Sequence, residues 1–190
     1  MLKLWPTEQK EAAQCYIAKY GFPDEITDSM LIWYEKQPWK KIVLHRYEID
    51  HHFPKQHKDF LTQTINYKVP ADKFDDLAVF DGSIIIDRTK GEISARCHDE
   101  MNNILSLNLA HDIITSKKTV REARDAYAQN LIAHRMKLPT PYMDHLRFSL
   151  KQNTADPDVS IMGETIIKRV KQNFKSSMKK IKWQVLYNRK

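Results

Sequence analysis

Glycine is scarce in this chain, with only four residues among 190. None of them belongs to a Gly-rich loop of the kind that cradles phosphate groups in P-loop or dinucleotide-binding proteins. This scarcity argues against the usual modes of nucleotide binding.

Cysteine is also scarce, and long apolar runs are missing. Cys15 and Cys97 are the two cysteines, in no CxxC or zinc-ribbon spacing, which favours reduced thiols over a disulfide framework. No run approaches the roughly 18 apolar residues of a membrane-spanning helix, and the first residues lack the apolar stretch of a signal peptide. The expected location is the cytoplasm.

The apolar content is sufficient for a folded domain. Hydrophobic residues make up 42% of the chain and aromatic residues 10%, which is richer than a disordered chain. A length of 190 residues fits one domain with an appendage. We expect an α+β globular domain over residues 1–150, followed by a linker and a basic amphipathic helical extension over residues 151–190.

Hydrophobic periodicity predicts an α+β fold. Helical spacing covers residues 8–20 and 24–36, whereas β-branched and aromatic residues with alternation indicate strands at 39–50, 60–69, 83–87 and 92–97. Gly91 supplies the positive φ that a tight hairpin between the last two strands needs. The predicted architecture is a four-stranded antiparallel meander covered by helices, with two N-terminal helices and a long basic amphipathic C-terminal helix.

Three further helices are expected after the second strand. A short one covers 71–80. Another covers 100–115, with Asp99 as its N-cap, and its apolar residues surround most of the axis, so it should lie between other elements and cover the sheet. Thr119 and Glu122 match a capping box that opens a helix to about Met136.

The net positive charge is confined to the C-terminal segment. Residues 151–190 hold ten Lys or Arg against three Asp or Glu, whereas residues 1–150 hold twenty-one of each. Asp156 as N-cap and Pro157 at the first helical position predict a long helix here. Such a confined excess indicates contact with an anionic surface or an acidic partner.

On a helical wheel, apolar residues recur about every four positions from Met162 to Val185, and basic residues fill the opposite arc. One interpretation is a helix that packs on its own domain or on a second copy of the chain, with its lysines solvated. The other is binding to an anionic surface, either nucleic acid or lipid head groups, which the position of Trp183 among the cations favours. The candidate binding residues are Lys168, Lys171, Lys175, Lys179, Lys182 and Trp183.

Histidines cluster in the connection between the first two predicted strands. We expect this segment to bring imidazoles and carboxylates together at one end of the sheet, where they could hold zinc or iron. The candidate metal ligands are Asp50, His51, His52, His57 and Asp59. The spacing matches no recognised metal motif, and Lys55 and Lys58 would repel a cation. The simpler interpretation is that this connection is a polar loop that binds no metal and that the protein has no cofactor.

Two other groups of polar residues lie at or within the predicted helix over residues 100–115. Cys97 precedes a predicted helix and follows Arg96, but His98 should point away from it if both lie in a strand, so a buried, inert thiol is favoured. His111 and its helical neighbours Asn108 and Asp112 are expected to form a structural hydrogen-bond network.

These patterns leave the enzymatic character of the chain open. The leading hypothesis is a non-enzymatic intracellular binding or assembly protein whose basic C-terminal helix contacts an anionic or acidic surface, which includes an acidic face of a second copy. The alternative is a metal-dependent hydrolase that uses the His-rich connection over residues 50–59.

Overall fold

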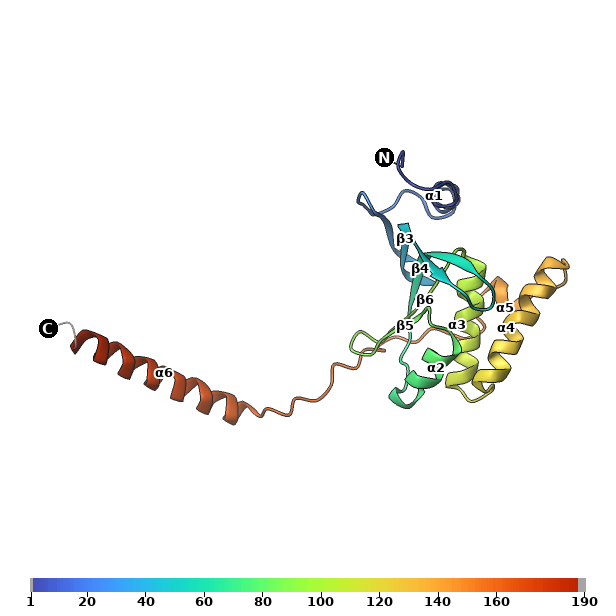
Figure 1. Ribbon diagram of the computed structural model, residues 1–190. Helices are drawn as coiled ribbons and strands as arrows, with labels where there is room; N and C mark the ends of the chain where they lie inside the picture. The colour runs from blue at the N-terminus through green and yellow to red at the C-terminus, as the bar shows by residue number, and fades with distance from the viewer. Residues whose placement is uncertain (1, 188–190) are drawn as a thin grey trace. The chain divides into compact units, whose positions relative to one another are not determined.

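The fold is α+β, and its sheet has six antiparallel strands (Figure 1). The computed structural model describes residues 2–187, with side chains described through Lys179. The strand order is β1-β2-β3-β4-β6-β5. The strands are β1 (Glu25–Ile26), β2 (Met30–Lys36), β3 (Trp39–His51), β4 (His57–Asn66), β5 (Ile84–Asp87) and β6 (Glu92–Cys97).

The expected four-stranded meander is therefore wrong in both strand number and order. In a meander β5 would lie next to β4. Here the second strand of the hairpin, β6, lies next to β4 instead, so that β6 pairs with both β4 and β5. In this register Leu61 faces Cys97. Hairpin turns can be recognised in a sequence, but the side on which a hairpin joins the sheet depends on contacts between distant residues.

The second N-terminal helix is also wrong, because residues 24–36 form β1 and β2. Leu31 and Trp33 are buried while their neighbours are not, which is the alternation of a strand with one face on the core. The indole of Trp33 lies tilted against the ring of Tyr16, with centroids 6.0 Å apart, and its Nε1 donates to the carbonyl of Gly21 at 2.9 Å. The apolar spacing of this short segment is compatible with both a helix and a strand. Packing of Trp33 against the first helix favours the strand.

The helices, in chain order, are α1 (Thr7–Tyr20), the 3₁₀ helix η1 (Ala71–Lys73), α2 (Phe74–Phe80), α3 (Glu100–Ile114), α4 (Val120–Arg135), α5 (Pro141–Asp144) and α6 (Glu164–Tyr187). The predicted capping box of α4 is confirmed, since the Thr119 and Glu122 side chains each bind the other's backbone N–H. Asp99 caps α3 as expected, accepting from the backbone N–H of Asn102 at 2.8 Å.

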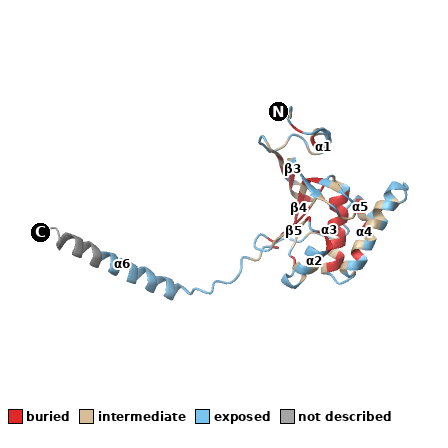
Figure 2. Cartoon of the chain, viewed as in Figure 1, coloured by how far each residue is buried: buried red, intermediate tan, exposed pale blue. Residues whose placement is uncertain are grey.

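Helix α3 is the centre of the core, as its all-round apolar character predicted. It contacts β4 and β6 on one side and α4 and α5 on the other, and Figure 1 shows it between the sheet and α4. Nearly its whole length is buried (Figure 2). Its Asn103 is fully buried and donates to the carbonyl of Leu61 and to Gln63, which fixes the helix to β4.

The chain divides into two compact units, Met1–Pro157 and Asp158–Lys190. The expectation that Asp156 caps the C-terminal helix and Pro157 opens it is wrong, so that helix is shorter than predicted and begins at Glu164. Asp156 instead pairs with Arg88 at 3.2 Å in the first unit. Among the described residues, no helix has the length and apolarity that crossing a membrane requires.

Candidate metal centre

Strand pairing brings two histidines and a carboxylate to one end of the sheet. His51 at the end of β3 lies directly opposite His57 at the start of β4, and their ring centroids are 4.9 Å apart. Asp59 follows two residues later and therefore lies on the same face of β4 as His57. The hairpin connection thus converts a sequence cluster into a spatial one.

Asp59 is fully buried and is surrounded by possible donors. Its Oδ2 accepts from the hydroxyl of Ser83 and lies 3.2 Å from Nδ1 of His51. The other ring nitrogen of His51, Nε2, lies 3.5 Å from Oδ1 of Asp81. Both nitrogens of His51 therefore face carboxylates, and burial raises the pKa of Asp81 although the Ser83 N–H donates to it.

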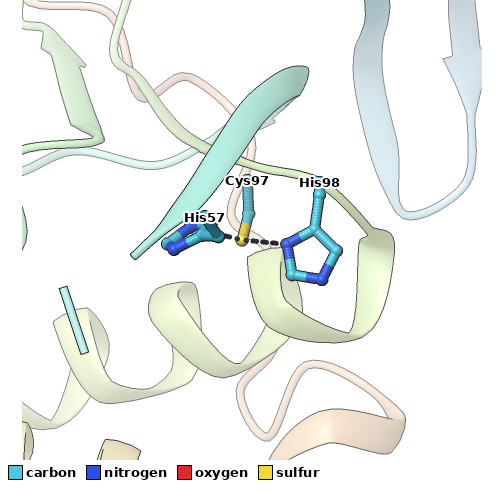
Figure 3. A group of neighbouring side chains, drawn as sticks. All are labelled: His57, Cys97 and His98. Atoms are coloured by element: carbon cyan, nitrogen blue, oxygen red, sulfur yellow. Dashed lines mark hydrogen bonds between the residues drawn. The ribbon is translucent and has the colours of Figure 1, made fainter. Parts of the chain in front are cut away.

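A thiol at the end of β6 and a third imidazole from the residue that follows join this cluster. Figure 3 shows the sulfur of Cys97 between the rings of His57 and His98. Sγ lies 3.4 Å from Nε2 of His57 and 3.3 Å from Nδ1 of His98. Because β6 ends at Cys97, His98 is outside the strand and turns toward the sulfur, contrary to the expectation that the two side chains point apart.

In His57 and His98, the ring nitrogen that faces away from Sγ (the outer nitrogen) lies near a hydrogen-bond acceptor, whereas the inner nitrogen faces Sγ. Nδ1 of His57 lies 2.8 Å from the backbone carbonyl of Lys55, and Nε2 of His98 lies 3.1 Å from Oδ2 of Asp99. If each outer nitrogen carries its proton, each inner nitrogen presents a lone pair toward Sγ. This is how metal-ligating histidines are oriented, with a carbonyl or carboxylate fixing the tautomer.

The two sulfur-to-nitrogen distances in this set are compatible with a single ion. Zinc bonds of about 2.1 Å to nitrogen and about 2.3 Å to sulfur, at tetrahedral angles, place ligand atoms roughly 3.5 Å apart. The two sulfur-to-nitrogen distances are 3.3 and 3.4 Å. The ligand atoms of His57, Cys97 and His98 all lie within 4.8 Å of one another.

A second possible ligand set, His51 with His57 and Asp59, overlaps the first at His57. It is the weaker set, since both nitrogens of His51 already face the carboxylates of Asp59 and Asp81. His57 can ligate one ion through Nε2, so the two sets exclude each other. The geometry favours the set that contains Cys97.

The site also contains buried acceptors that lack a donor. Oδ1 of Asp59 lies 3.0 Å from Nε2 of His57, but in a direction that makes no hydrogen bond, and Oδ1 of Asn102 likewise has no partner. Buried oxygens of this kind usually mark the place of an ion or an ordered water. Both lie beside the three proposed ligands.

The electrostatics of the ion-free chain disfavour a free thiolate. Burial, followed by the charges of Asp99 and Asp59, raises the pKa of the Cys97 thiol well above its ordinary value. The Asp59 carboxylate raises the pKa of His57 against the effect of burial. Burial alone would raise the pKa of Asp99, but hydrogen bonds from His98 and Asn102 hold it below its ordinary value.

A cleft of about 410 Å³ opens over the ligand set. His57, Cys97 and His98 all line it; Cys97 is buried and His98 is exposed. Its walls combine apolar side chains of α3, α4 and α5 with basic side chains. The charged lining residues are Lys55, Lys58 and Arg135 together with Glu8 and Asp99. A ligand in this cleft would therefore meet side chains of both charges near the proposed metal position.

Of the residues predicted as metal ligands, Asp50 and His52 stay apart from the centre. Both are exposed, and Asp50 pairs with Lys58 at 2.5 Å across the hairpin. His51, His57 and Asp59 converge as described. Lys58 is thus partly neutralised by Asp50, so its charge opposes a cation less than its sequence position indicates.

The predicted binding residues lie in the second unit. Lys168, Lys171, Lys175 and Lys179 are exposed on α6, and Lys168 lies 3.2 Å from Glu164. The side chains of Lys182 and Trp183 lie outside the described residues. The placement of Trp183 therefore bears on neither interpretation of the helix.

Searches against protein-family models, curated proteins and solved structures find no match to this chain.

Proposed function

We propose that the chain is a metal-dependent hydrolase whose ion, zinc or iron, is held by His57, Cys97 and His98. One observation carries this proposal. Two imidazole nitrogens face one buried sulfur at ligand spacing, with both outer nitrogens bound to acceptors, at the floor of a cleft. Three protein ligands that open on a cleft are typical of catalytic sites rather than closed structural ones.

The bound ion would supply Lewis acidity and lower the pKa of a water molecule at its open position. Asp59 would accept the proton of that water, because its Oδ1 lies 3.0 Å from Nε2 of His57 and has no hydrogen-bond partner. In ester hydrolysis at such a site, the water oxygen would bond to the carbonyl carbon or phosphorus while the bond to the leaving oxygen breaks, and Asp59 would pass the proton it took from the water to that leaving oxygen. His51 and Ser83 orient the Asp59 carboxylate through contacts with its other oxygen, Oδ2.

Metal binding is tested first, on protein purified without an affinity tag. We expect near-stoichiometric zinc or iron by elemental analysis, and an intense sulfur-to-metal charge-transfer band when Co²⁺ is titrated into the chelator-treated chain. Cys97→Ser and His57→Gln should each weaken binding by roughly 100-fold or more.

The chain offers matched controls for both variants. Cys15 is an exposed free cysteine and His52 is an exposed histidine of the same connection, so Cys15→Ser and His52→Gln should bind the ion like the unchanged chain. If either control loses the ion as strongly as its partner variant does, the ligand assignment is wrong.

Hydrolysis is tested on the metal-loaded chain with p-nitrophenyl acetate and p-nitrophenyl phosphate. Turnover should vanish on chelation and return with the ion. Asp59→Asn should keep the ion and reduce kcat by roughly 100-fold or more, as loss of a general base does. A chain that binds the ion stoichiometrically and hydrolyses neither class of ester would contradict a catalytic role and leave a structural metal site.

A second function is supported by the C-terminal unit, which we propose binds an anionic surface. Over the described helix residues 164–179, α6 carries five basic residues and a single acidic one, all exposed. Replacement of Lys168, Lys171, Lys175 and Lys179 by glutamine should abolish salt-sensitive retention on heparin, a soluble polyanion. Retention that survives these substitutions would refute this function.

A further inference from the structure

The apolar stripe of α6 is continuous and exposed. Large apolar side chains recur on one side of the helix within an arc of about 120°. These side chains are each between 37% and 67% exposed, and they belong to Ile166, Ile167, Val170, Phe174 and Met178. Exposed apolar side chains that gather on one face mark a surface that another apolar phase covers.

The opposite arc of the helix is basic. Lys168, Lys175 and Lys179 lie on the far side from Val170 and Phe174, and Lys171 lies at the border between the two arcs. The apolar arc contains no charged residue, and Glu164 is the sole acid among the described helix residues. Apolar and positive surfaces therefore run side by side along the whole described part of the helix.

We infer that α6 binds an anionic lipid surface, lying in the plane of the interface with its apolar stripe among the acyl chains and its lysines at the head groups. This inference rests on the second proposed function and names its partner. An interfacial helix is recognised by these properties together: a strong apolar face, a Lys-rich polar face and low net hydrophobicity. Negative head groups add attraction for each lysine near the surface.

A lipid surface accounts for both the apolar and the basic arc, whereas nucleic acid or a second copy of the helix accounts for only one of them. Nucleic acid would engage the lysines and leave most of the stripe in water, since recognition of single strands depends on stacking with aromatic rings and the described stripe holds one such ring, Phe174. A second copy of the helix would bury the stripe, but Ile166, Val170, Phe174 and Met178 recur at steps of four residues. A coiled-coil seam requires a mean spacing of about 3.5 residues between its apolar positions, so a stripe with steps of four would wind around the helix and lose contact with a partner helix.

The experiment measures sedimentation of the full chain with vesicles of phosphatidylcholine alone or mixed with phosphatidylserine. We expect binding to the mixed vesicles, weakened by salt, and at least roughly tenfold weaker binding to phosphatidylcholine alone. Two variants separate the arcs: V170S/F174S in the stripe, and K168Q/K171Q/K175Q/K179Q in the basic arc. Both should weaken binding to mixed vesicles by roughly tenfold or more.

The matched control places serine at two apolar side chains of the first unit, Val79 and Ile132, which are 65% and 59% exposed. V79S/I132S should bind mixed vesicles like the unchanged chain. A chain that binds heparin and a DNA or RNA oligonucleotide but not mixed vesicles overturns the lipid inference and keeps the anionic-surface function. Failure to bind any of these probes overturns both, and a stripe variant that binds vesicles unchanged overturns the lipid inference alone.

Discussion

His111 on α3 lies outside the candidate metal centre, and its neighbours favour the neutral imidazole. Its ring stacks on Phe148 with centroids 4.3 Å apart, and its Nδ1 lies 2.7 Å from the hydroxyl of Tyr67. Burial, followed by the charge of Lys117, lowers the pKa of His111, against an opposing effect of Asp112. Burial raises the pKa of Tyr67 to about 12, so the phenol keeps its proton and donates to the neutral ring.

This arrangement predicts that protonation of His111 destabilises the fold. The unfolded histidine titrates near pH 6.5 and the folded one below it, so the unfolded chain binds more protons in that interval. The contribution to stability is complete above about pH 6.5 and is lost as the pH falls through the folded pKa. His111→Phe keeps a ring against Phe148 and removes the titration.

Urea denaturation at about pH 7.5 and about pH 5.5 measures the effect, because these values bracket the titration of histidine. The unchanged chain should lose more free energy of unfolding between the two pH values than His111→Phe does. The comparison cancels the titration of the other histidines. Equal losses in the two proteins would contradict the assignment of a neutral His111.

At the same scale, the sequence indicated part of the candidate site. His51, His57 and Asp59 could be expected together because a hairpin joins their strands. Cys97 and His98 could not, because their approach depends on β6 joining β4 and ending one residue before His98. The Cys-His pair before a helix cap was a usable signal, but applying the alternation of strand side chains to His98, one residue beyond the predicted strand, hid it.

At the scale of elements, the β5–β6 hairpin depends on Gly91 for two reasons. Its φ is +66°, a left-handed conformation that side chains disfavour, and a Cβ built there would lie 2.1 Å from the backbone of Thr154. The segment after α5 therefore crosses the hairpin turn in direct contact with the glycine. Thr154 is buried and its hydroxyl donates to the Gly91 carbonyl at 2.7 Å.

Gly91→Ala should accordingly lower the free energy of unfolding by roughly 1–3 kcal/mol, since neither backbone can move away without loss of hydrogen bonds. Gly82→Ala is the matched control, because Gly82 has no positive φ and a Cβ there meets nothing within 4 Å. Urea denaturation of both variants measures the difference. Equal stability of the two variants would show that the hairpin accommodates the added methyl group.

Element identity was predicted best where local chemistry decides it. The Asp99 and Thr119 caps are local signals, and both helices begin where these residues predict. Residues 24–36 contain no such signal, and packing of Trp33 against α1 decided between helix and strand. Strand order has the same limitation, because no local pattern encodes the insertion of β6 between β4 and β5.

At the scale of the whole molecule, the charge distribution and the division into units coincide closely. The basic excess of the sequence lies after residue 150, and the second compact unit begins at Asp158. The seven residues between belong structurally to the first unit. They contribute the Thr154 bond to Gly91, and the backbone N–H of Asp156 lies 3.3 Å from the carbonyls of Arg88 and Thr89.

Two truncations therefore should differ in stability although they differ by only seven residues. A chain that ends at Pro157 keeps every contact of the first unit and should unfold at the same urea concentration as the full chain. A chain that ends at Leu150 loses the buried Thr154 and its hydrogen bond, which should cost about 1–2 kcal/mol. Far-ultraviolet circular dichroism in urea follows both. If the chain that ends at Pro157 is also destabilised, the second unit contributes to the stability of the first and the division into independent units is wrong.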